Sequence, residues 1–97
     1  MVTYMMLMKL TDMGSKDIKS APQKIEEGIK TFESMGGKVL GFYAALGEYD
    51  YVAIGESPND ETGTTFALGL SAQGYVKTTT VKLFTKEQFV GMVNKLT

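Results

Sequence analysis

The residue types that do most protein chemistry at neutral pH are missing from this 97-residue sequence, which contains no histidine and no cysteine. A Ser-His-Asp triad, a thiol nucleophile, a disulfide and an iron–sulfur cluster are therefore excluded, and the commonest metal ligand is absent. Tyrosines, carboxylates and lysines remain as candidates. The missing residue types favour a non-catalytic protein without deciding against an enzyme, and we expect no cofactor and no metal site.

The most distinctive candidate is the turn Gly47-Glu48-Tyr49-Asp50, which lies between two predicted strands. The Asp50 carboxylate can accept hydrogen bonds from backbone N–H groups in its own turn. Alternatively, it faces a ligand amine or a partner subunit. Tyr49 is more typical of a packed aromatic with a bonded hydroxyl than of a catalytic acid.

A second group of candidates lies on the predicted strands. Tyr4 and Met6 are two residues apart and share a strand face. Together with Tyr43 and the turn residues Gly47, Tyr49 and Asp50, they predict an apolar pocket with a few polar groups, which is how small-molecule sites are usually built. Ordinary core packing is the alternative interpretation.

Two acidic residues, Asp60 and Glu61, begin a predicted helix. We interpret them as favourable charges at the positive end of the helix dipole, without a convergent partner for acid–base or metal chemistry.

The elements that must position these residues alternate along the chain. Apolar periodicity predicts strands over 2–10, 38–46, 51–56 and 75–84, helices over 20–35 and 57–72, a final helix after Thr85, and a polar loop over 11–19. Ser20, Ser57 and Thr85 are the predicted helix N-caps. Strict alternation places Val39, Gly41 and Tyr43 on one face of the second strand.

This β-α-β-β-α-β-α order predicts an α+β fold, a ferredoxin-like βαββαβ plait with an added C-terminal helix and a four-stranded antiparallel sheet. Strands 2–10 and 38–46 are apolar on both faces, but the crossover helices can cover only one. We therefore expect a second copy of the chain to cover the other face, giving a homodimer or a higher homo-oligomer.

Composition limits the remaining possibilities. The net charge is −1, the pI is about 5.3, and the ten basic residues form no cluster, so we expect no nucleic-acid partner. No apolar run reaches the roughly 20 residues of a membrane span, and no secretory leader is evident. We expect a single domain over 1–97 that is cytoplasmic and does not bind membranes.

Matching segments run along essentially the whole chain. They comprise Thr3-Tyr4, Thr11-Asp12 with Gly14, Ser20-Ala21-Pro22, Gly36-Gly37-Lys38, Phe42-Tyr43, Gly47-Glu48-Tyr49-Asp50, Ser57-Pro58-Asn59-Asp60-Glu61 and Gly74-Tyr75-Val76-Lys77-Thr78-Thr79-Thr80. In these segments the sequence resembles the GYD-domain family. The resemblance implies a ferredoxin-like fold and a dimeric α/β-barrel assembly, and it implies no activity. Lys24 and Lys77 stand where arginine is frequent in that family, and lysine lacks arginine's bidentate fork.

The Gly-x-Tyr-Asp turn followed by a strand and a helix is also similar to the effector-binding domain of leucine-responsive-type regulators. That similarity implies a small amino-acid effector near Gly47, Tyr49 and Asp50.

Two functions follow as hypotheses. The first is a non-catalytic module that binds a small ligand or assembles as an oligomer. The alternative is a cofactor-free dimeric α/β-barrel enzyme, an oxygenase or isomerase, acting on a small apolar or aromatic compound.

Overall fold

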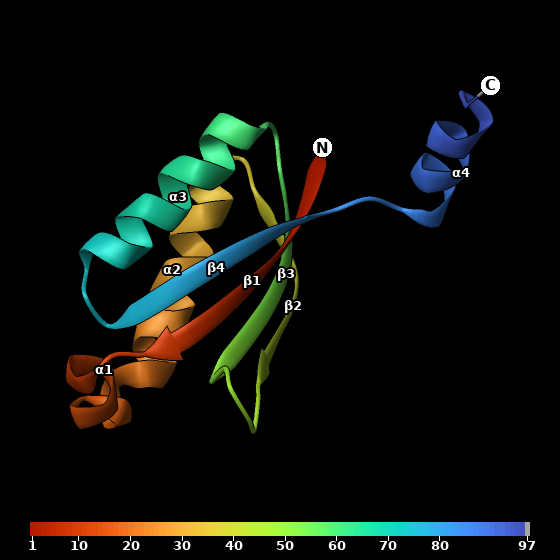
Figure 1. The fold of residues 1–97 in the computed structure, drawn as a ribbon. Helices are drawn as coiled ribbons and strands as arrows, with labels where there is room; N and C mark the ends of the chain where they lie inside the picture. The colour runs from red at the N-terminus through yellow and green to blue at the C-terminus, as the bar shows by residue number, and fades with distance from the viewer. Residues whose placement is uncertain (97) are drawn as a thin grey trace.

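A computed structural model describes residues 1–96 of the chain (Figure 1). In chain order its elements are β1 (Val2–Leu10), α1 (Asp12–Lys16), the short 3₁₀ turn η1 (Ile18–Ser20), α2 (Ala21–Ser34), β2 (Lys38–Ala44), β3 (Tyr51–Ser57), α3 (Asp60–Ala72), β4 (Val76–Leu83) and α4 (Lys86–Asn94). The predicted order of the four strands, the two long helices and the final helix is confirmed. The predicted loop over 11–19 was wrong, because α1 and η1 occupy it.

The four strands form one antiparallel sheet with the order β2-β3-β1-β4. Strands β1 and β3 are central, so each is paired on both edges. The predicted α+β class and the four-stranded antiparallel sheet are confirmed, and the strand order is the one expected for the split β-α-β arrangement.

Helices α2 and α3 lie side by side over the same face of the sheet (Figure 1). Their aromatic rings meet between the layers, where the centroids of Phe32 and Phe66 are 4.9 Å apart. Phe32 is 7% exposed and Met8, beneath the helices on β1, is 5% exposed. A Cβ added to Gly37 would lie 2.5 Å from the Phe32 ring, so the glycine leaves room for that ring.

The opposite face of the sheet has no helix over it within residues 1–96 (Figure 1). Side chains alternate along β1, so Met5 and Leu7 point away from the helices. Leu7 pairs with Val52, and Val52 pairs in turn with Tyr43. We call this surface the open face, and define it by Met5, Leu7, Tyr43, Val52 and Val81.

A β-bulge corrects the predicted faces of β2. Val39 pairs with Gly55 and Gly41 pairs with Ile54, so Leu40 is an extra residue in the ladder. The bulge puts Val39 and Phe42 together on the helix side, whereas Tyr43 lies on the open face. One inserted residue reverses the alternation of a strand.

The helix N-caps differ in part from the predicted ones. Thr85 caps α4 as predicted, in a capping box with Gln88. Ser20 makes no capping bond, and its hydroxyl donates to Asp17 instead. Asn59, not Ser57, caps α3 by accepting a hydrogen bond of 2.8 Å from the Thr62 N–H, while Ser57 is fully buried.

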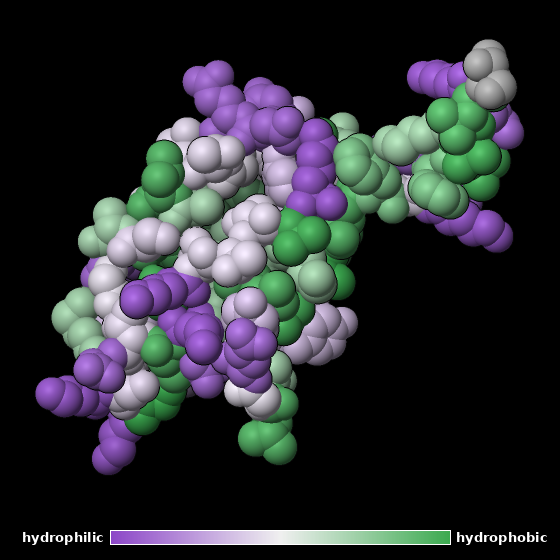
Figure 2. Space-filling view, viewed as in Figure 1, coloured by the Kyte–Doolittle hydropathy of each residue, from purple (hydrophilic) through white to green (hydrophobic). Residues whose placement is uncertain are grey.

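Helix α4 lies away from the sheet and from α2 and α3, at the end of an extended segment that follows β4 (Figure 1). The domain measures 54 × 30 × 19 Å along its principal axes, so it is far from spherical. The apolar side chains of α4 are exposed, with Phe89 at 61% and Val90 at 45%, and they form an apolar surface in the space-filling view (Figure 2). None of the helices within residues 1–96 has both the length and the apolar character needed to cross a membrane.

Candidate functional site

A cavity of about 140 Å³ lies between the two covering helices and the sheet. We call it the interlayer cavity. Its walls are mostly apolar and include Met6, Met8, Ile25, Ile29, Phe66 and Leu70. These walls come from β1, α2 and α3, so the same two layers that form the core also enclose the cavity.

Gly28 keeps part of this space empty. It lies in the middle of the apolar stripe of α2, between Ile25 and Ile29, and it lines the cavity. A Cβ added to Gly28 would meet no heavy atom within 4 Å. Glycine inside a helix costs roughly 0.5–1 kcal/mol relative to alanine, so an open wall is kept here at the expense of helix stability.

Opposite charges lie where one end of the cavity meets solvent. Lys24 and Asp17 both line the cavity, and Lys24 Nζ is 3.7 Å from Asp17 Oδ2. The ammonium also lies 4.1 Å from the centroid of the Tyr75 ring, in a cation–π arrangement. Gln73 adds an amide to the same wall.

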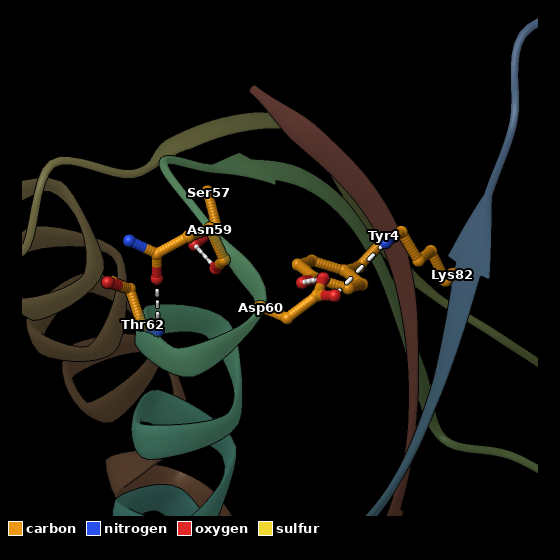
Figure 3. A network of polar contacts seen from close by, with 6 residues as sticks. All are labelled: Tyr4, Ser57, Asn59, Asp60, Thr62 and Lys82. Atoms are coloured by element: carbon orange, nitrogen blue, oxygen red, sulfur yellow. Dashed lines mark hydrogen bonds and ion pairs between the residues drawn. The ribbon is translucent and has the colours of Figure 1, made fainter.

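A second polar cluster lies at the other end of the cavity (Figure 3). The Tyr4 hydroxyl donates to Asp60 Oδ1, and Lys82 Nζ donates to Asp60 Oδ2 over 3.1 Å. Tyr4 and Leu10 are six residues apart on β1, so the two ends of the cavity are about 20 Å apart. Tyr4 lines the cavity, whereas Asp60 and Lys82 do not, so this cluster borders the cavity through the Tyr4 ring.

Two features of α3 hold this cluster in place. The Asn59 cap starts the helix so that Asp60, in its first turn, points to Tyr4 (Figure 3). Gly63, one turn later, allows the ring of Tyr4 to lie against the helix, because an added Cβ would be 2.7 Å from a ring carbon.

The cluster shifts the acidity of both partners. Desolvation, and then the hydrogen bond and charge of Asp60, raise the pKa of Tyr4 to about 12. The hydrogen bonds from Tyr4 and from Lys82 lower the pKa of Asp60. At neutral pH the site therefore holds a neutral phenol that donates to a carboxylate, and such a phenol is a poor general base.

The structure brings together only two of the six predicted site residues. Tyr4 and Met6 line the interlayer cavity. Tyr43 is 59% exposed on the other side of the sheet, because the β-bulge turns it there. The pocket predicted against Tyr4, Met6 and Tyr43 is therefore not formed within one copy of the chain.

The turn residues Gly47, Tyr49 and Asp50 also lie outside the cavity lining. The turn is at the end of β1 that carries Met8 and Leu10, whereas Tyr4 pairs with Gly55 toward the other end. Gly47 has a φ of +142°, a value that favours glycine. These residues shape the hairpin, and no described contact connects them to Tyr4.

Asp50 ties the hairpin to β1 by two hydrogen bonds. Its Oδ2 accepts from the Leu10 N–H over 2.8 Å, and its own N–H donates to the Met8 carbonyl over 2.8 Å. The prediction that its carboxylate accepts from N–H groups of its own turn was wrong. The donor is the N–H of Leu10, which lies 40 residues away along the chain.

Sequence reasoning did not identify Asp17 and Lys24 as cavity residues. It also did not identify Lys82 and Tyr4 as partners of Asp60. Their partners come from distant parts of the chain, and no local motif indicates such pairs. Gly28 was the available signal, since a glycine within an apolar helical stripe leaves a gap. Within residues 1–96 no group of three or more carboxylates could hold a metal ion.

Fold and site together define an α+β domain with one uncovered sheet face and an apolar cavity beneath two helices. The family model of the GYD domain matches residues 4–93. A protein of Thermus thermophilus named glutamine synthetase and cystathionine beta-lyase binding protein is 35% identical over 83 residues, which cover 84% of this chain and 87% of that protein. The chain belongs to the GYD-domain family, as its resemblance predicted.

The Asp50 tie to β1 generates a stability prediction. We expect Asp50→Ala to lower the free energy of unfolding by about 1–3 kcal/mol, because the part-buried Leu10 N–H loses its acceptor. Asp50→Asn keeps an acceptor oxygen and should lose less. Urea denaturation followed by circular dichroism measures both, with Glu48→Ala, an exposed carboxylate in the same turn, as the control. Equal stability of Asp50→Ala and Glu48→Ala would show that the hydrogen bond from Leu10 to Asp50 does not stabilise the fold.

The Tyr4 pKa generates a second prediction. The tyrosinate absorbance of the wild type minus that of Tyr4→Phe should titrate near pH 12, and in Asp60→Asn the same difference should move toward 10. Because the folded pKa is raised, the contribution to stability is complete below pH 10 and is lost as the pH rises toward 12. A difference titration centred near 10 in the wild type would contradict the hydrogen bond.

Proposed function

We propose that this chain is a homo-oligomeric, non-catalytic binding protein whose partner is a metabolic enzyme. The observation that carries the proposal is the open face. Apolar side chains there, such as Leu7 and Val52 on the two central strands, have no covering layer in residues 1–96. Apolar surfaces of this kind mark interaction sites in soluble proteins.

Pairing of two open faces supports the oligomer. A two-fold contact between sheets places Leu7, Val52 and Tyr43 of one copy against the same residues of the other. Each such side chain contributes roughly 1.5–3 kcal/mol when it becomes fully buried. Helix α4 extends away from its own domain (Figure 1), and a neighbouring copy would also cover its apolar side.

The enzyme partner is supported by the Thermus relative, whose name states that it binds glutamine synthetase and cystathionine beta-lyase. A second exposed feature of this chain suits such a contact. Leu46, at the tip of the β2–β3 hairpin, is 105% exposed, and the tip protrudes as an apolar knob (Figure 2). Asp50 anchors the base of the same hairpin to β1 by a hydrogen bond, so the exposed tip is held in a defined position.

A second candidate function is small-molecule binding, and the interlayer cavity favours it. The cavity is apolar, and two partly exposed charged side chains, Lys24 and Asp17, line it at one end. These are the usual features of a ligand site. The two functions are compatible, because the cavity and the open face lie on opposite sides of the sheet.

The oligomer is tested by sedimentation. We expect the wild type to sediment as a dimer or larger species at micromolar concentration, and Val52→Lys to dissociate it, because two lysines would be buried against each other. Tyr43→Lys, at a position already 59% exposed, should weaken it without disturbing the fold. Leu68→Lys, on an exposed position of α3, is the control. A wild-type monomer would contradict the proposal.

The enzyme partner is tested with purified glutamine synthetase and cystathionine beta-lyase from the same organism as the chain. We expect one of them to bind the immobilised wild type, and Leu46→Glu to weaken binding at least about tenfold, or 1.4 kcal/mol. Leu68→Glu introduces the same charge on α3 and should bind like the wild type. Failure of both enzymes to bind would contradict the enzyme partner, and full binding by Leu46→Glu would contradict the hairpin tip as its contact.

A further inference from the structure

The size of the interlayer cavity limits what it can hold. Its volume is about 140 Å³. Apolar cavities of about 150 Å³ stay dry and bind benzene. Met6, Ile25 and Ile29 offer this space no hydrogen-bonding side-chain atoms, so the group that enters must be apolar. A single phenyl ring or a branched aliphatic chain fits these limits.

The charges at one cavity end add a second requirement. Lys24 and Asp17 line the cavity, but their 3.7 Å separation is longer than a good hydrogen bond. Their side chains are 36% and 44% exposed, and ion pairs of this kind contribute little to stability. Asp17 Oδ1 also accepts from the Ser20 hydroxyl over 2.9 Å, so a ligand that interacts with Lys24 and with Asp17 Oδ2 can replace the ion pair while that hydrogen bond stays in place.

The opposite signs of these two groups select the ligand class. A simple carboxylic acid would bring its negative charge beside Asp17, and a simple amine would bring its positive charge beside Lys24. A zwitterion satisfies both, because its carboxylate binds the Lys24 ammonium and its ammonium binds the Asp17 carboxylate. The distance between the two charges of an α-amino acid is similar to the separation of Lys24 and Asp17.

We propose that the interlayer cavity binds an apolar α-amino acid, with its side chain beside Gly28 and its charged groups on Lys24 and Asp17. This inference rests on the small-molecule role proposed above for the same cavity. The polar cluster of Tyr4, Asp60 and Lys82, about 20 Å away along β1, has its hydrogen bonds made internally. The amino acid therefore enters from the Lys24 end.

Three compounds that share a phenyl ring but differ in charge test whether the ligand must be a zwitterion. Isothermal titration calorimetry should show binding of L-phenylalanine, with 3-phenylpropionate and 2-phenylethylamine each at least about tenfold weaker, or 1.4 kcal/mol. Glycine, which has the charges without a side chain, should show no binding. Benzene tests the apolar cavity without any charge.

Variants of the chain locate the site. Gly28→Leu fills the space beside Gly28, where an added Cβ meets nothing, and should abolish binding of L-phenylalanine. Gly69→Leu is the matched control: an added Cβ there also meets nothing, and Gly69 does not line the cavity. Lys24→Met and Asp17→Asn should each weaken binding about tenfold, whereas Lys30→Met, on the exposed side of α2, should not. Circular dichroism verifies that every variant is folded.

The outcomes separate the two levels of the proposal. Equal or tighter binding of 3-phenylpropionate or 2-phenylethylamine would overturn the zwitterion and leave the cavity as a ligand site. Absence of binding by all three ring compounds and by benzene would overturn the small-molecule role itself. Unchanged phenylalanine binding in Gly28→Leu would place the site elsewhere and overturn the inference.

Discussion

A four-stranded sheet with apolar residues on both faces has only two long helices to cover it. The β-α-β-β-α-β connectivity sends both α2 and α3 to the same side, so Leu7 and Val52 on the central strands have no helix over them within residues 1–96. The arrangement is stable on one side, where Phe32 and Met8 are buried. The opposite side has no covering layer within residues 1–96, and this is the physical basis of the binding role proposed above.

The covered side is itself filled unevenly. Near the Gly37 end of α2, the Phe32 ring occupies space left by Gly37 and by Gly55, and an added Cβ at either glycine would be closer than normal contact. Gly28 is four residues before Phe32 on α2, about one helical turn away, and it lines the cavity where an added Cβ would meet nothing. Close packing is the rule for protein interiors, so a layer that is tight at Phe32 and open at Gly28 has a localised gap instead of a loosely packed core.

Periodicity and turn chemistry predicted the elements of this fold because those features are local. The helix stop at Gly36, the capping box at Thr85 and the alternation of β1 each depend on residues within a few positions. The face of Tyr43 could not be predicted in the same way, since it depends on an inserted residue at Leu40 that no sequence alternation marks. The hydrogen-bond partner of Asp50 was predicted wrongly for a related reason. Its carboxylate could accept from its own turn or from β1, and only the packing of the hairpin against β1 decides between them.

The candidate site was harder to predict than the fold, because its polar groups converge from separate elements. Asp60 was correctly placed at a helix start, where a carboxylate stabilises the dipole, but Tyr4 and Lys82 reach it from β1 and β4 across 56 and 22 residues of sequence. The two pairs of charged groups, Asp60 with Lys82 and Asp17 with Lys24, differ in how many of their hydrogen bonds are already made. At the Asp60 end both carboxylate oxygens accept hydrogen bonds from within the chain. At the Asp17 end Oδ1 accepts from the Ser20 hydroxyl over 2.9 Å, whereas Oδ2 lies 3.7 Å from Lys24 Nζ, and that ammonium also lies over the Tyr75 ring. A charge whose hydrogen bonds are already made gains little from a ligand, whereas a loosely paired one gains more. This asymmetry, and not the cavity volume alone, is the reason for placing the charged groups of a ligand at the Lys24 end.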